Sequence, residues 1–191
     1  INNNTQNEEV VLDANKKSKE FKFFNLSSVS HSHDHKYIAY NVDTNGSEYY
    51  DLSIEETNSQ KIITKNIKNT TGTIIWHPNN KTIFYTVLDQ NHRPNKIYAH
   101  QIGSDAKHDE LIFEEKDPAF FCSPELSQSK KYLLIRTGDH RTSEYWYSKI
   151  DEFKNLKCFK KRVEKEEYEI DHAENQFYIL MKIIQKIGKI M

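Results

Sequence analysis

The sequence has only two cysteines, Cys122 and Cys158, and they stand in unrelated contexts without the short spacing of a metal site. We expect two reduced thiols in a cytoplasmic protein rather than a disulfide. No apolar run reaches the ~18 residues of a membrane helix, and the start, Ile1–Asn4, has none of the parts of a signal peptide. Because the chain opens without methionine, we expect its true start upstream.

Glycine is scarce as well. The five glycines stand at positions 46, 72, 103, 138 and 188, and no two are four apart. The G-x-S-x-G turn that exposes a nucleophilic serine is therefore absent, as are the glycine-rich loops that hold phosphates and dinucleotides. We predict no catalytic residue and no cofactor. A net charge of −1 removes the usual argument for nucleic acid or an anionic membrane as a partner.

Aromatic residues are plentiful, with 11 tyrosines and 10 phenylalanines, and they favour strands over helices. A turn followed by a lysine or similar residue and four mostly apolar residues recurs along the chain. The third residues of the copies, 36, 81, 131 and 176, are 45, 50 and 45 positions apart. The copies are Asp34–Tyr40, Asn79–Tyr85, Ser129–Ile135 and Glu174–Leu180.

The stretch from His92 to Phe121 shows the remainder of one unit. Lys96–Ile102 alternates like a strand, Gly103–Asp105 supplies a turn, Leu111–Phe113 reads as the next strand, and an acidic loop follows. Strands comparable to Lys96–Ile102 are predicted at 47–54 and 143–150. Four strands in about 45 residues is typical of a β-propeller blade, whereas helical repeats need a period of 3.6 residues.

The fold class predicted is therefore all-β, an incomplete β-propeller. About three full four-stranded blades are expected, with partial blades at each end. Residues 1–180 form this propeller part, and a short strand is expected at 8–13. The expected boundaries are a blade tail at about 8–29, blades at about 30–74, 75–122 and 123–168, and the start of another blade at 169–180.

Each blade would bury its faces against its neighbours, and large side chains are expected between blades. The residues expected there are Tyr40, Trp76, Phe84, Tyr85, Tyr132, Leu134 and Tyr178. An open arc would leave apolar faces and strand edges uncovered, so we expect poor solubility or self-association.

Residues 181–191 break the pattern. Their apolar positions 183, 184, 187 and 190 would share one helix face, which suggests a membrane or partner helix. Eleven residues are marginal for an isolated helix, so an aberrant or truncated end is the preferred interpretation.

Two polar clusters invite a binding interpretation. His31, His33 and His35 stand at alternate positions around Asp34, as metal ligands on one face of a strand could. The other repeat copies hold no ligands at these positions. We therefore prefer a solvated turn and predict no metal. The basic run from Lys154 to Lys165 is followed directly by glutamates and reads as a solvated loop rather than a ligand patch.

Several segments together resemble the propeller of the oligopeptidase B (protease II) branch of the prolyl oligopeptidase family of serine peptidases. The resemblance runs from about residue 8 to residue 180, with departures at Ala99 and at Ser32–Asp34. The segments are Glu9–Asp13, Ala39–Tyr40, Asn69–Trp76, Asn80–Tyr85, Arg93–Pro94, Ile97–His100, Ile102–Asp105, Asp109–Asp117 and Thr142–Tyr145.

The resemblance implies a seven-bladed propeller that caps an α/β-hydrolase domain, which this chain lacks. In that family a Ser-Asp-His triad on the hydrolase domain cleaves short peptides after Lys or Arg, and the propeller limits access. The chain is then a non-catalytic fragment, inactive alone, whose partners are the hydrolase domain and short basic peptides. The alternative is a stand-alone propeller that scaffolds protein partners. Arg93, Arg136 and Arg141 could face the hydrolase domain or the central channel.

Overall fold

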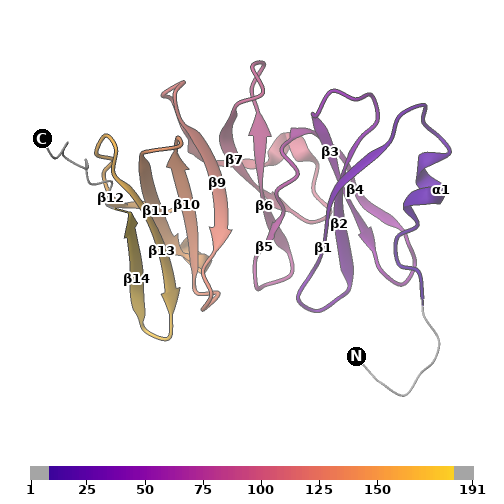
Figure 1. Cartoon of the computed structure of the whole chain (residues 1–191). Helices are drawn as coiled ribbons and strands as arrows, with labels where there is room; N and C mark the ends of the chain where they lie inside the picture. The colour runs from indigo at the N-terminus through magenta and orange to yellow at the C-terminus, as the bar shows by residue number, and fades with distance from the viewer. Residues whose placement is uncertain (1–8, 183–191) are drawn as a thin grey trace, which may run out of the picture.

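The computed structural model describes residues 9–182, and its antiparallel sheets follow one another along an arc (Figure 1). Before the first sheet lies one short helix, α1 (Ala14–Ser18), whose N-cap Asp13 accepts a hydrogen bond from the Lys16 amide. Residues 9–13 form no strand, so the strand expected at 8–13 is wrong within the described part. No helix within residues 9–182 is long and apolar enough to cross a membrane.

The first sheet has the strand order β1-β2-β3-β4 and continues at β4 into the second, so that the two together form one eight-stranded hydrogen-bonded sheet. The strands are β1 (Asn25–His31), β2 (Tyr37–Asp43), β3 (Tyr50–Glu56) and β4 (Ile62–Thr70). Val29 pairs with Tyr40, so residues 25–29 belong to this sheet and not to a preceding blade tail.

The second sheet repeats this arrangement with a first strand of only two residues. The strands are β5 (Ile75–Trp76), β6 (Thr82–Leu88), β7 (Pro94–Gln101) and β8 (Glu110–Glu114). A 3-10 turn, η1 (Ala106–His108), precedes β8. A single pair, Thr70 with Val87, links this sheet to the first.

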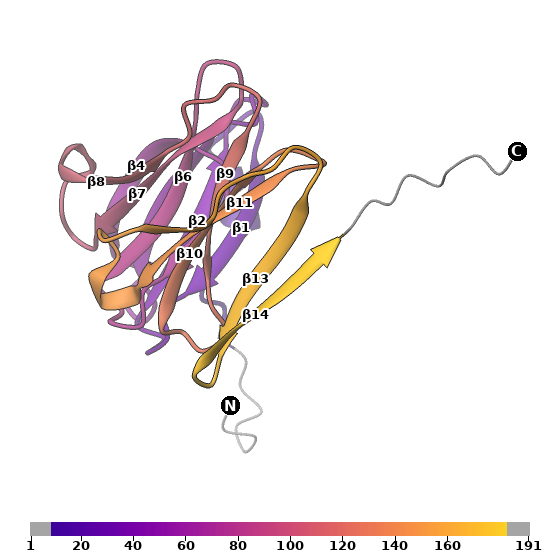
Figure 2. The same ribbon diagram turned by 90° about the vertical axis from the view of Figure 1, so that its left-hand side faces the viewer.

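The third sheet has the order β9-β10-β11-β12, and a two-stranded hairpin follows it. The strands are β9 (Phe121–Leu126), β10 (Tyr132–Gly138), β11 (Ser143–Lys149), β12 (Lys157–Lys160), β13 (Glu167–Ala173) and β14 (Gln176–Lys182). A 3-10 turn, η2 (Ile150–Glu152), follows β11. In Figure 2 the hairpin β13–β14 lies in front of the third sheet.

Some boundaries differ from those expected by a few residues. The third sheet begins at Phe121 rather than 123, and the last hairpin begins at Glu167 rather than 169. Met181 and Lys182, expected in an aberrant tail, continue strand β14. The rest of that tail, residues 183–191, lies outside the described residues.

The recurring lysine motif marks the same turn in three sheets. The amides of Lys36, Lys81 and Lys131 donate to the side-chain oxygens of the residues two positions before them, at 3.3, 2.8 and 3.2 Å. The residue preceding each lysine has φ near +60°, as a tight turn requires. The repeat thus encodes the turn between the first and second strands of a blade.

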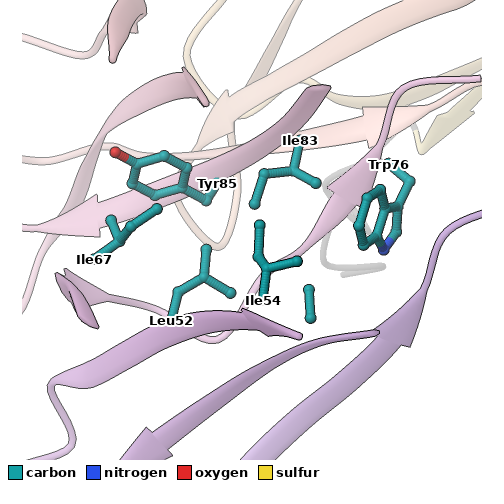
Figure 3. Close-up of a cluster of buried hydrophobic side chains, with 7 residues drawn as sticks. Leu52, Ile54, Ile67, Trp76, Ile83 and Tyr85 are labelled. Atoms are coloured by element: carbon teal, nitrogen blue, oxygen red, sulfur yellow. The ribbon is translucent and has the colours of Figure 1, made fainter. Parts of the chain in front are cut away.

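Three apolar clusters hold neighbouring sheets together. The first lies between the first and second sheets, the second between the second and third sheets, and the third between the third sheet and the hairpin β13–β14. Figure 3 shows the first cluster, in which Leu52 and Ile54 from β3 face Ile83 and Tyr85 from β6. Successive four-stranded sheets that pack face to face define an incomplete β-propeller, as the sequence predicted.

Candidate functional site at the interfaces between blades

The interface between the first and second blades contains two of the aromatic residues singled out in the sequence. Trp76 and Tyr85 are 4% and 3% exposed and contact the apolar side chains of β3 and β4 (Figure 3). The Trp76 indole nitrogen is buried without a hydrogen-bond partner in the described part of the chain. The contact of these rings with the first blade is therefore apolar.

The second interface is centred on Phe84, which is fully buried with Ile97, Leu133 and Ile135. The ring of Phe153, which follows β11, meets Phe84 edge to face at a centroid distance of 5.1 Å. Side chains from two sheets and a loop thus close this interface.

The third interface brings the hairpin β13–β14 onto the third blade. Leu134 is 1% exposed and packs with Tyr145, Tyr168 and Ile170. Tyr132 is partly buried at the edge of this cluster, where its ring lies 5.0 Å from that of Phe177.

Two of the seven residues expected between blades make no contact between blades in the described chain. Tyr40 is buried, but its hydroxyl contacts Glu55 of its own blade and Lys17 of α1. Burial and the Glu55 carboxylate raise the pKa of Tyr40. Tyr178 is 48% exposed on β14, whose free side meets no other blade in the described chain. The alternation of side chains along a strand did not indicate which of its two faces a neighbouring blade would cover.

A partly buried ionic contact that the sequence did not indicate joins the second and third blades. Arg162 Nη2 lies 2.6 Å from Oε2 of Glu115 and 3.3 Å from Oε1 of Glu144. Glu115 also accepts a hydrogen bond from the Thr137 hydroxyl. The Arg162 guanidinium lies 4.1 Å from the centre of the Phe120 ring. The sequence favoured a solvated loop between blades for Lys154–Lys165, which is wrong in two parts. Lys157–Lys160 form strand β12, and Arg162 is anchored by Glu115 and Glu144 between blades.

The electrostatics of Glu144 reflect this contact. Burial by itself would raise the pKa of Glu144, but hydrogen bonds from the Arg162 amide and guanidinium outweigh it and lower the pKa. Glu144 is thus held in its charged form beside Arg162.

A second cluster of buried polar side chains places a carboxylate, a histidine and a hydroxyl in a row, as in a catalytic triad. His100 Nδ1 lies 2.7 Å from Asp109 Oδ1, and His100 Nε2 lies 2.9 Å from the Thr64 hydroxyl. Tyr85 donates its hydroxyl proton to Asp109. The side chains of His100 and Asp109 are 0% and 2% exposed, so no substrate reaches them. This group joins β4 of the first blade to the second blade.

In the histidine cluster, His31 is the last residue of β1, and His33 and His35 lie in the turn that follows; all three are exposed. The rings of His31 and His35 lie 4.6 Å apart, and His33 Nδ1 is 3.5 Å from the Lys130 amino group. Within residues 9–182, no three His, Cys, Asp or Glu side chains are grouped so that they could hold a metal ion.

The three arginines singled out earlier have different surroundings. Arg93 donates to the carbonyl oxygens of Asp117 and Phe120, Arg136 lies 3.9 Å from the Glu167 carboxylate, and Arg141 is exposed in a loop. Of the three, Arg93 stabilises the connection from the second to the third blade.

Both cysteines are free thiols. Burial, together with the nearby Glu115 charge, raises the pKa of Cys122 to about 12. Burial also raises the pKa of Cys158, which is partly exposed. Neither thiol is activated as a nucleophile.

Comparison with known proteins identifies the class. The family model described as prolyl oligopeptidase, N-terminal β-propeller domain, matches residues 2–186. The chain belongs to this family, and it comprises the propeller part. Its sequence is similar to Protease 2 of Moraxella lacunata, with 31% identity over 176 residues, which cover 91% of this chain and 26% of that protein.

Two solved structures are similar in fold. Oligopeptidase B from Leishmania major superposes with a TM-score of 0.85 at 23% identity, over 91% of this chain and 25% of that one. Oligopeptidase B from Trypanosoma brucei, solved in a closed form with covalently bound antipain, superposes with a TM-score of 0.82 at 26% identity, over 93% of this chain and 25% of that one. The chain spans about a quarter of each relative's length.

Proposed function

We propose that this chain acts as the access-limiting propeller portion of an oligopeptidase-B-like serine peptidase and has no hydrolytic activity by itself. Its partner is an α/β-hydrolase domain that carries the catalytic triad, and the substrates of the pair are short peptides cleaved after Lys or Arg. The main support is the match to the family's N-terminal propeller over residues 2–186. The absence of a G-x-S-x-G turn from the sequence also supports it.

The chemistry of the polar groups supports a structural role for this part of the enzyme. The Asp109, His100 and Thr64 side chains are enclosed between blades, and both thiols have raised pKa values. A nucleophile must contact its substrate, which these groups do not. The free thiols also support our proposal of a reducing compartment such as the cytoplasm, which cell fractionation would test.

Hydrolysis of an arginine-containing chromogenic dipeptide by the purified chain tests the claim of inactivity. We expect no rate above that of buffer and no labelling by a fluorophosphonate that reacts with activated serines. Turnover that copurifies with the chain through two chromatographic steps would contradict the proposal. Reading the flanking DNA for a G-x-S-x-G within a strand, turn and helix tests the claim of a hydrolase partner.

A second candidate function is a stand-alone propeller that binds other proteins. The exposed apolar residues of β14 favour it, since Tyr178, Ile179, Leu180 and Met181 are 45–63% exposed. Flanking DNA without any hydrolase sequence would favour this second function over the first.

A further inference from the structure

The second and third blades form a cavity of about 480 Å³ between them, beside the turns that carry the lysine motif. Its walls come from the turn after β5, the turn before β10, the end of β11 and η2. Both blades have four strands, so the cavity lies between complete blades. Its volume is in the range of pockets that bind small molecules.

Part of the cavity wall is apolar. Pro78 and Tyr132 line it from the two turns. Ile150 lines it from η2, is 5% exposed and belongs to the apolar cluster between the second and third blades. An apolar or aromatic body of a ligand would pack against this wall, because the burial of apolar surface is favourable.

The rim of the cavity is positively charged. Lys130, Lys131 and Lys149 line it, and all three are exposed. Within the described part of the chain, the Lys130 amino group has another base as its hydrogen-bond partner, His33 Nδ1 at 3.5 Å. The Lys131 amino group donates to a backbone carbonyl and to an amide oxygen, both neutral. Lys149 lies 3.9 Å from a carboxylate that is itself 57% exposed, so water weakens that pair.

The buried His77 lines the same cavity and is 3% exposed. Its Nδ1 accepts from the Asn79 amide at 2.9 Å, and its Nε2 donates to the Ile150 carbonyl oxygen at 3.1 Å. Burial lowers the pKa of His77, and the charge of His33 acts in the same direction. A buried titratable group with a shifted pKa in a cavity is typical of a binding site.

His33 connects these observations, because it contacts Lys130 and also acts on His77. Basic side chains from the first, second and third blades therefore gather beside one cavity. Like charges that are held close together repel each other, and an anion bound between them relieves this repulsion. The arrangement thus favours an anionic ligand.

The charge of the wall indicates the class of the anion. Three lysines against the single carboxylate of Asp151 leave two positive charges. A phosphate monoester carries about two negative charges near neutral pH, whereas a carboxylate carries one. Lysine amino groups are point charges on flexible stems and commonly bind phosphate.

We propose that this cavity binds a small organic phosphate, a phosphate monoester whose phosphate group is held by Lys130 and Lys149. The apolar body of the ligand packs against Pro78, Tyr132 and Ile150. Binding requires neither the hydrolase domain nor peptidase activity, so this proposal and the proposed function are tested separately.

The first experiment is a titration of the ¹⁵N-labelled chain followed by NMR. The probes are phenyl phosphate, inorganic phosphate and benzyl alcohol. We expect phenyl phosphate to give saturable shifts of the amides near Asn79, Lys131 and Ile150. Inorganic phosphate should bind about fivefold more weakly and benzyl alcohol at least about tenfold more weakly.

Each control probe removes one part of the ligand. Inorganic phosphate that binds as tightly as phenyl phosphate would mean an adventitious ion only and would overturn the proposal. Benzyl alcohol that binds as tightly would show that no anion is recognised. Shifts spread over the whole surface would also contradict a single site.

Benzoate tests the charge of the ligand, because it carries one negative charge on the same ring. We expect benzoate to bind at least about threefold more weakly than phenyl phosphate at pH 7.5. Equal affinities of benzoate and phenyl phosphate would contradict the assignment to a phosphate monoester.

Two variants locate the site. Lys130→Gln and Lys149→Gln each remove one charge, so each should weaken the binding of phenyl phosphate by about fivefold. The matched control is Lys157→Gln, because Lys157 is exposed on β12 and does not line the cavity. Thermal melting of each variant separates lost binding from lost folding. Unchanged affinity in both variants, or an equal loss in Lys157→Gln, would refute the site.

Discussion

Arg162 reaches from the end of the third blade to Glu115 at the end of the second, with 2.6 Å between Nη2 and Oε2. Glu115 is 6% exposed and Arg162 is 26% exposed at the side chain, so water screens this pair only in part. Removal of one partner would leave a buried carboxylate without its cation.

We therefore expect Arg162→Ala to lower the free energy of unfolding by about 2 kcal/mol, less than for a fully buried pair because Arg162 keeps some solvent contact. Urea denaturation of wild type and variant measures this difference in the free energy of unfolding. The control is Lys165→Ala, since the Lys165–Glu164 pair is 66% and 83% exposed and should change the free energy by less than about 1 kcal/mol. Equal effects of the two variants on the free energy of unfolding would show that the contact between blades does not stabilise the chain.

Removal of the Phe84 ring should disrupt the second interface. Phe84 is fully buried against the third blade, so Phe84→Ala should cost about 3–5 kcal/mol of unfolding free energy. Tyr178→Ala should cost less than about 1 kcal/mol, because that ring is 48% exposed. Chemical denaturation measures the free energy of unfolding of both variants. A similar loss of free energy in both would contradict the prediction that the buried ring contributes more to stability.

Acid should destabilise the chain in part through His77. Burial lowers the pKa of His77 below the ordinary value of 6.5, although hydrogen bonding to the Ile150 carbonyl and the charge of Asp151 act in the opposite direction. The unfolded chain then takes up a proton at a pH where the folded chain does not. The stability due to neutral His77 is present above pH 6.5 and is lost as the pH falls from there through its lower folded value.

Thermal melting between pH 7.5 and pH 5 tests the role of His77. His77→Gln should be less stable than wild type at pH 7.5 and should lose less stability on acidification. His140→Gln is the control, because His140 is exposed in a loop. An unchanged pH dependence in His77→Gln would rule out this histidine as a contributor.

The β14 edge should cause the chain to associate. Within the described residues β14 pairs only with β13, and no charged residue interrupts it from Gln176 to Met181. Unprotected edges of this kind pair with other strands. Light scattering at increasing concentration should show a rising mass for wild type and a monomer for Leu180→Lys. Val163→Lys is the control, since Val163 is equally apolar and 52% exposed but lies in a loop. A monomeric wild type at all concentrations would contradict the prediction.

The repeat allowed most of the fold to be predicted because each copy places the same turn before the same strand. The amides of Lys36, Lys81 and Lys131 donate to the side chains of Asp34, Asn79 and Ser129, and these turn-forming residue types are visible in the sequence. The length of the first strand of a blade was harder to predict. Strand β1, for example, contains Asn25, Ser27, Ser28 and Ser30 and lacks an apolar pattern. Its place in the sheet comes from pairing with β2, which is a tertiary effect.

The contacts between blades were predictable only where they are apolar. Phe84 and Leu134 could be recognised as interior residues by their neighbours in sequence. Arg162 and Glu115 are 47 positions apart, and each lies in a run of charged residues that ordinarily is solvated.

The helix α1 makes the two ends of the arc unlike. Lys17 of α1 binds Glu55 and Tyr40 of the first blade, whereas at the opposite end of the described residues β14 pairs only with β13 (Figure 1). An exposed edge strand can pair antiparallel with the same strand of a second copy. Two copies joined through β14 about a twofold axis would form a pair that is closed to further addition.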